Sequence, residues 1–186
     1  GLDSSCGAGL VRDAATVSAL GGSPIVCATA VTAQGAHGVL AVHPIPPGVI
    51  TAQIVASDAV KIGVLCDRTT VEAVAESLAE FPLTPVVLDP VIAASSGGRL
   101  LSDNGITAML DVLLPRVDLI TPNLPELRIL AEANGITAEN PSDQAQGLLR
   151  LGARAVLVKG GHANGPEAID LLIEPDGTTP LGGPRY

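Results

Sequence analysis

The chain of 186 residues is long enough for one domain of ordinary size. Its formal net charge of −9, from ten cationic and nineteen anionic side chains, excludes nucleic acid and anionic membrane as partners, because both bind to basic surfaces. No apolar stretch approaches the roughly 20 residues of a membrane span, and no signal peptide opens the chain. Its three cysteines lack the spacing of a zinc site or a disulfide framework, so we expect a cytoplasmic protein.

The apolar residues of the first half are almost entirely aliphatic and fall into short periodic runs. Hydrophobic residues make up 47% of the whole chain but aromatic residues only 1%, which suits helices packed on a buried parallel sheet. The pattern predicts helices over residues 10–20, 49–54 and 70–81, with Pro47 opening the second of them. It predicts strands over residues 25–32, 39–43 and 60–65.

The second half continues the alternation of strand and helix. Predicted strands are residues 86–88, 117–120 and 155–158, and predicted helices are residues 106–114, 125–133 and 142–151, the last capped by Ser142. A hairpin follows, with strands 168–173 and 178–181. This order predicts an α/β fold with a mainly parallel central sheet flanked by helices. We expect one domain over residues 1–186, incomplete at both ends, because the chain opens without methionine and stops at Tyr186 on no obvious boundary.

Lys159 is one of only two lysines in the chain, and it stands at the end of the apolar run Ala-Val-Leu-Val-Lys (155–159). Ligands of open α/β sheets bind just beyond the carboxyl ends of the strands. Gly160 and Gly161 follow, and glycines let backbone N–H groups come close to an anion. The sequence therefore predicts a phosphate contact at Lys159.

Two carboxylates also stand at or near predicted strand ends. Asp89 ends the run Pro-Val-Val-Leu-Asp, and Glu126 lies three residues after Asn123 in Thr-Pro-Asn-Leu-Pro-Glu. Mg²⁺ takes one or two carboxylates together with substrate phosphates, so both are candidate metal ligands. A competing explanation is that Asn123 and Glu126 form a helix capping box, whose spacing they match. The convergence of these sites and Lys159 on one rim favours a functional role.

The opening segment, Gly-Leu-Asp-Ser-Ser-Cys-Gly-Ala-Gly, leads directly into the first predicted helix. The free N–H groups of that helix could face an anion, although a simple turn explains the glycines as well. Neither the P-loop pattern nor GxGxxG occurs. Asp13, one turn into the helix, could accept hydrogen bonds from a ligand or lie on an ordinary solvated face. Gln34 could bind the edge of a heterocycle or cap a loop.

The cysteines and histidines carry less information. Cys6 precedes a helix, where the pKa of a thiol can be lowered, but we expect all three cysteines to be structural. The histidines share no metal-ligand spacing, and we expect them to be structural or surface residues. These residues are Cys6, Cys27, Cys66, His37, His43 and His162.

Taken in order, these segments resemble the ribokinase-like superfamily, and within it the hydroxymethylpyrimidine/phosphomethylpyrimidine kinases of thiamin biosynthesis. The specific feature is Thr-Pro-Asn-Leu-Pro-Glu (121–126) combined with Val-Lys-Gly-Gly-His (158–162). The resemblance implies a three-layer α/β fold. It also implies phosphoryl transfer from MgATP to a pyrimidine hydroxymethyl group, and then to the monophosphate. We further expect a homodimer.

The resemblance also implies the roles of individual side chains, which fall into two groups. The group that holds the pyrimidine comprises Asp13, Gln34, Val64 and Val91. In the second group, Asn123 and Glu126 organise magnesium and phosphate, and Lys159 contacts the ATP phosphates.

The chain departs from the family pattern at several points. No strand precedes Gly1, Cys6 replaces a glycine, and the connection from Gln53 to Lys61 is about half a dozen residues short. The Gly-Thr-Gly-Cys segment, which supplies the group proposed to activate the hydroxyl, does not occur and would follow Tyr186. No catalytic base is therefore assigned. The alternatives are a pyridoxal kinase of the same fold and a non-catalytic ligand-binding domain.

Overall fold

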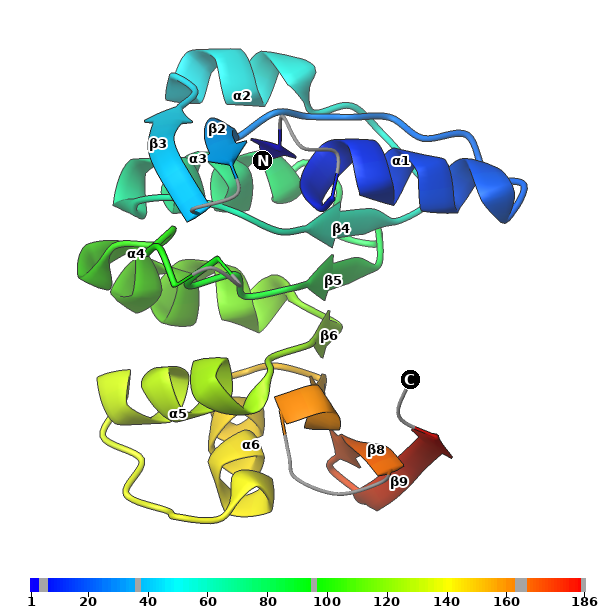
Figure 1. Ribbon diagram of the computed structural model, residues 1–186, viewed down its shortest axis with the longest axis vertical. Helices are drawn as coiled ribbons and strands as arrows, with labels where there is room; N and C mark the ends of the chain where they lie inside the picture. The colour runs from blue at the N-terminus through cyan, green and yellow to red at the C-terminus, as the bar shows by residue number, and fades with distance from the viewer. Residues whose placement is uncertain (4–6, 36–37, 95–96, 163–166, 185–186) are drawn as a thin grey trace.

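The computed structural model describes residues 1–3, 7–35, 38–94, 97–162 and 167–184 (Figure 1). Its strands are β1 (Leu2–Asp3), β2 (Ala30–Gly35), β3 (Gly38–Pro44), β4 (Val60–Ile62), β5 (Val86–Leu88), β6 (Leu119–Ile120), β7 (Ala155–Val158), β8 (Glu167–Glu174) and β9 (Gly177–Pro184). Its α-helices are α1 (Gly9–Ala19), α2 (Pro47–Gln53), α3 (Arg68–Leu78), α4 (Asp103–Ala108), α5 (Leu124–Ala133) and α6 (Pro141–Arg150). A π-helical segment (Met109–Leu113) and two 3₁₀ turns (Leu114–Arg116 and Gly160–His162) complete the list.

The strands form two sheets. The larger has six strands in the order β4-β5-β6-β7-β8-β9, of which β4 to β7 are parallel and the β8–β9 hairpin is antiparallel. The smaller has the order β1-β2-β3, with β1 parallel to β2 and a β2–β3 hairpin. The prediction of a mainly parallel central sheet is therefore confirmed. A strand at the very start of the chain was not predicted.

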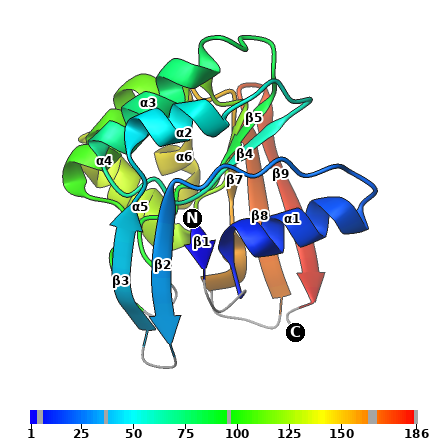
Figure 2. The same ribbon diagram turned by 90° about the horizontal axis from the view of Figure 1, so that it is seen from above.

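Helices lie on both sides of the central sheet (Figure 2). Helices α2 to α6 gather on one side, and α1 lies alone on the other, beside β4 (Figures 1 and 2). The side of the sheet that faces α2–α6 forms the aliphatic core, and fully buried members include Leu88, Ile120, Leu127 and Val156. By contrast, no residue of α1 is buried. Residues 54–59 join α2 to the edge strand β4.

Side-chain caps fix where several helices begin. Asp67 caps α3 by accepting a hydrogen bond from the Thr70 N–H at 2.9 Å. The prediction that Ser142 caps α6 is wrong, because Asn140 is the cap and accepts from the Asp143 N–H at 2.8 Å. Pro141 then occupies the first helical position, where a missing N–H costs nothing.

The predicted strand over residues 25–32 is also wrong in its first half. Strand β2 begins only at Ala30, where pairing with Pro44 of β3 begins. Ile25 and Val26 are exposed, and the N–H of Ala28 donates to the Gln53 side chain rather than to a neighbouring strand. Apolar content alone therefore extended the prediction beyond the residues that have a strand partner.

Candidate functional site

One cavity of about 490 Å³ lies at the carboxyl ends of the parallel strands, between the central sheet and the start of α1. Seven of the predicted site residues line it: Asp13, Val64, Asp89, Val91, Asn123, Glu126 and Lys159. Gln34 lies on β2, but its side chain is outside the part of the chain that the structure describes. Residues from five separate regions of the sequence therefore share one cavity.

Lys159 immediately follows β7, and the ends of the neighbouring strands hold it in place. Its backbone N–H donates to the Pro122 carbonyl at 2.8 Å, and its backbone forms an isolated bridge with Asn123. Its ammonium lies 2.8 Å from Oδ1 of Asp89, the first residue after β5. Lys159 is thus already paired with a carboxylate before any phosphate arrives.

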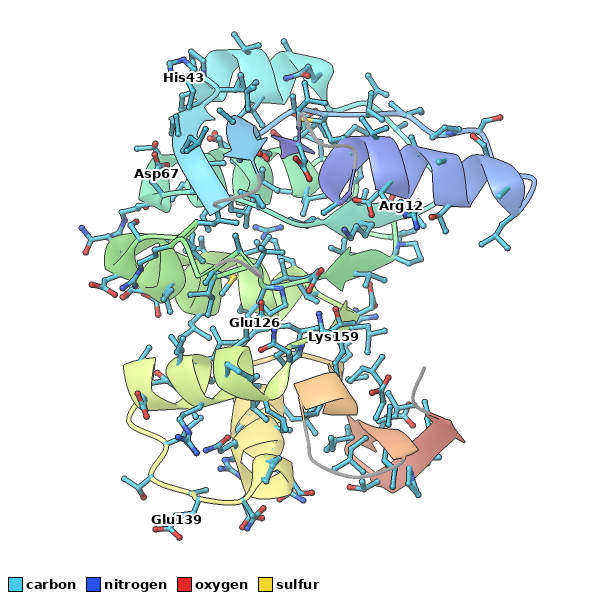
Figure 3. All side chains as sticks on the ribbon, in the orientation of Figure 1. Arg12, His43, Asp67, Glu126, Glu139 and Lys159 are labelled. Carbon is cyan, nitrogen blue, oxygen red and sulfur yellow. The ribbon has the colours of Figure 1, made fainter. Side chains whose placement is uncertain are left out.

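Asn123 and Glu126 form the capping box at the start of α5. The Glu126 N–H donates to Oδ1 of Asn123 at 2.8 Å, and Oε2 of Glu126 accepts from the Asn123 N–H at 2.8 Å. The prediction that Asn123 and Glu126 form a capping box is therefore confirmed. Capping does not remove Glu126 from the cavity, since Glu126 also lines it and lies beside Lys159 (Figure 3).

Glu126 is a buried carboxyl, with only 6% of its surface exposed. Burial raises the pKa of this carboxyl, which the hydrogen bond from the Asn123 backbone and the positive charge of Lys159 only partly oppose. Asp89 and Glu126 together fit a magnesium ion, because Mg²⁺ takes one or two carboxylates and completes its shell with phosphate oxygens and water. In the described part of the chain, no larger group of histidine, cysteine and carboxylate side chains could hold a metal.

The other end of the cavity lies beside α1 and β4. Val64 and Val91 contribute partly buried apolar walls. Asp13 projects from α1, and its Oδ2 lies 2.8 Å from the ammonium of Lys61 on β4. An apolar wall beside a carboxyl hydrogen-bond acceptor suits a flat, polar-edged ring.

Sequence reasoning missed two of the charged residues that line this cavity, Lys61 and Asp3. Lys61 is the second of the two lysines, and its place in an otherwise apolar strand was a signal that could have been followed. Asp3 is buried, and its Oδ2 accepts a hydrogen bond from the Ala8 N–H at 3.2 Å across the glycine-rich segment. A lone aspartate among small residues offered no periodic signal.

The glycine after Lys159 is required by its surroundings. A Cβ on Gly160 would overlap the carbonyl group of Ile169 on β8. The Gly160 N–H donates to Oδ1 of Asp170 at 2.7 Å, which ties the segment after Lys159 to the hairpin. Gly160 is therefore needed for close packing, and its N–H is already occupied.

Among the cysteines and histidines, the structure describes the side chains of Cys27, Cys66 and His43. Burial raises the pKa of the Cys27 and Cys66 thiols, as expected of structural residues. Cys27 lines the cavity and is only half-buried, whereas Cys66 is buried. His43 is exposed on β3 (Figure 3). Cys6, His37 and the side chain of His162 lie outside the described residues.

A family model described as phosphomethylpyrimidine kinase matches residues 3–186. The chain belongs to this family. It is 41% identical over 192 aligned residues to the hydroxymethylpyrimidine/phosphomethylpyrimidine kinase of Escherichia coli (strain K12), with all of this chain and 72% of that protein covered. Members of a kinase family use ATP, so the chain is an ATP-dependent phosphotransferase that acts on a hydroxyl group.

Solved structures agree with this assignment. A phosphomethylpyrimidine kinase from Clostridium difficile 630 superimposes with a TM-score of 0.84 at 34% identity, over 97% of this chain and 80% of that chain. An ADP complex of Bacillus subtilis pyridoxal kinase superimposes with a TM-score of 0.85 at 27% identity, over 100% of this chain and 73% of that one. The expected ribokinase-like fold is confirmed. In the described residues, no helix is long and apolar enough to cross a membrane.

Proposed function

We propose that the chain phosphorylates 4-amino-5-hydroxymethyl-2-methylpyrimidine, and then its monophosphate to the diphosphate, in thiamin biosynthesis. The observation that carries the proposal is that one cavity joins a cation and two carboxylates at one end to apolar walls and Asp13 at the other. Polyphosphate fits the first end and a small polar ring the second. The names of the relatives from E. coli and C. difficile point to the same chemistry.

At the phosphate end, we propose that Lys159 changes partner when ATP binds. Its ammonium is held 2.8 Å from Asp89, and both side chains are partly exposed, so a γ-phosphate can reach it. A charge-assisted contact to phosphate would replace one to carboxylate. Asn123 would contact phosphate beside it. Asp89, released by Lys159, would with Glu126 hold Mg²⁺, which when bound neutralises charge on the phosphate oxygens.

At the acceptor end, we propose that Asp13 and Gln34 orient the pyrimidine through its amino group and ring nitrogens. Val64 and Val91 would lie against the ring and exclude water from it. Such transfer depends mainly on alignment and charge neutralisation, which these residues supply. No side chain is assigned here as the base that activates the hydroxyl.

Three broader properties remain proposals. We propose a single domain over residues 1–186 and a cytoplasmic location. We also propose a homodimer, for which apolar side chains on the β2–β3 hairpin offer a contact surface: Val31 is 41% exposed and Leu40 is 73% exposed. Analytical ultracentrifugation tests the dimer, and a sedimentation coefficient of a monomer at micromolar concentration would contradict it.

A second candidate function is a pyridoxal kinase, favoured by the superposition with the B. subtilis enzyme. The two are separated by measuring ADP release with MgATP and either hydroxymethylpyrimidine or pyridoxal. We expect the larger kcat/KM for the pyrimidine. A larger value for pyridoxal would favour the second candidate, and turnover of neither would favour a non-catalytic domain.

The phosphate-end assignment is tested by Lys159→Met. We expect kcat/KM to fall about 10²–10³-fold, the usual loss when one charge-stabilising group is removed. Stability should change by no more than about 1 kcal/mol, because the ion pair is partly exposed. The matched control is Arg154→Met. Arg154 directly precedes β7, at the end of the strand opposite to Lys159, and its guanidinium lies 2.9 Å from the Asp118 carboxylate. Wild-type turnover in Lys159→Met would remove the assignment.

A further inference from the structure

Lys61 and Asp13 meet across the acceptor end of the cavity, although 48 positions separate them in the sequence. The Lys61 Nζ lies 2.8 Å from Oδ2 of Asp13, and the two side chains are 42% and 40% exposed. The pair therefore links helix α1 to the edge strand β4 at the place where the pyrimidine is proposed to bind.

The sequence around Lys61 explains how its ammonium reaches the cavity. Ile62 is buried in the core, so Lys61 and Gly63 point to the opposite side of the strand. Gly63 has no side chain, and a Cβ there would lie 3.6 Å from the Lys61 Nζ. The lysine thus extends over Gly63 toward the carboxyl end of β4, where Asp13 lies.

Helix α1 is less firmly anchored than the other helices, so its position depends more on this contact. None of its residues is buried, and it lies apart from α2–α6 (Figure 2). Over the described residues, the contact between Lys61 and Asp13 is the one side-chain hydrogen bond that joins α1 to the six-stranded sheet. A partly exposed ion pair contributes little to stability, so its effect should be on the position of Asp13 rather than on folding.

We propose that Lys61 is a positioning residue for the acceptor. It holds Oδ2 of Asp13, a residue that lines the cavity, so that Oδ1 of the same carboxylate can accept a hydrogen bond from the pyrimidine. This inference rests on the proposed function. Without Lys61, the Asp13 carboxylate can rotate freely and α1 can shift. Binding of the pyrimidine must then order both, and this entropic cost weakens the affinity.

The test is steady-state kinetics of Lys61→Met with hydroxymethylpyrimidine and MgATP varied in turn. We expect KM for the pyrimidine to rise about tenfold, the cost of ordering an immobilised side chain on binding. The KM for ATP and the kcat at saturating pyrimidine should stay within about twofold. Lys61→Arg should restore most of the pyrimidine affinity, because a guanidinium can hold the same carboxylate.

Two further variants separate positioning from general damage. Asp13→Asn combined with Lys61→Met should bind the pyrimidine no more weakly than Asp13→Asn alone, because Lys61 acts through Asp13. Arg68→Met is the matched control, since it breaks a comparably exposed ion pair with Glu72 on α3, away from the cavity. It should leave both KM values unchanged.

The inference is overturned if Lys61→Met keeps the wild-type KM for pyrimidine, or if its effect adds in full to that of Asp13→Asn. An equal rise of KM in Arg68→Met would overturn it too. If Lys61→Met fails to fold, Lys61→Arg and Lys61→Gln decide the matter, with the arginine expected to bind pyrimidine and the glutamine not. Failure of the proposed function has a different signature, which is wild-type protein that does not phosphorylate the pyrimidine.

Discussion

Replacing Glu126 by glutamine separates the two roles that this side chain combines. In the wild-type protein, Glu126 belongs to a capping box and is also a buried carboxyl group of the cavity. Glu126→Gln keeps the shape and an oxygen that can accept the Asn123 N–H, but it removes the charge. Any loss of activity at intact stability therefore reports on charge and not on capping.

The expected change in stability is small because two contributions oppose each other. A hydrogen bond to a charged group contributes about 1.5–3 kcal/mol and a neutral one about 0.5–1.5 kcal/mol, so the weaker acceptor costs about 1 kcal/mol. Against this, burial raises the pKa of the Glu126 carboxyl despite the Asn123 hydrogen bond and the charge of Lys159, which means that the fold disfavours the ionised form. We expect Tm at pH 7 to change by less than about 4 °C.

The expected change in activity is large. The proposed role of Glu126 in holding magnesium predicts that its loss lowers kcat about a hundredfold and increases the Mg²⁺ concentration required for half-maximal rate. The assay is ADP release at varied MgCl₂, with Glu132→Gln as the control, because Glu132 is an exposed residue of the same helix. Wild-type rate and Mg²⁺ dependence in Glu126→Gln would show that Glu126 only caps α5.

The pH dependence of stability follows from the same carboxyl. Because its pKa is raised in the fold above the ordinary 4.5, the folded protein binds this proton more tightly than the unfolded chain. The corresponding stability is present below pH 4.5 and is lost as pH rises through the raised pKa. Urea unfolding of wild type and Glu126→Gln should thus show a difference that grows in favour of the variant above pH 4.5. A difference that stays constant from pH 4 to pH 7 would refute the reasoning.

Two further substitutions test the packing around the site and the helix caps. Gly160→Ala should lose about 1–3 kcal/mol, because its Cβ meets the Ile169 carbonyl, whereas Gly161→Ala, whose Cβ would meet nothing, should not; equal urea midpoints would contradict this. Asp67→Ala should cost about 1 kcal/mol at pH 7 through loss of the α3 cap. Burial raises the pKa of the Asp67 carboxyl, but the hydrogen bonds from Thr70 and Thr69 outweigh it and hold the pKa below 3.8. The stability cost of Asp67→Ala should therefore decrease only when the pH falls below 3.8. A cost that is the same at pH 7 and pH 3 would be inconsistent with this cause.

Local pattern in the sequence was enough to predict most elements and part of the site. The apolar runs that became β5 and β7 are short and buried, so composition alone identified them. The residues that end these strands, Asp89 and Lys159, could be placed on one rim because parallel strands share a carboxyl edge. The spacing of Asn123 and Glu126 likewise predicted a capping box, since that contact lies within four residues.

Errors arose where a local signal was weaker than a partner elsewhere in the chain. Ile25 and Val26 looked like strand residues, but pairing with β3 begins only at Ala30. Ser142 looked like a cap, but Asn140 precedes a proline that suits the first helical turn. The strand or helix propensity of a residue describes the conformations that it tolerates. Whether the residue adopts one of them depends on the neighbouring strand or turn.

By itself, the sequence determined the α/β class, most of the strands along the chain, and which polar residues end them. Only the tertiary structure decided how those residues are partnered. It paired Lys159 with Asp89 across 70 positions and Lys61 with Asp13 across 48. The physical reason is that the attraction between opposite charges depends on the distance between them in space. Packing of the sheet and helices sets that distance, not the separation of the two residues in the chain.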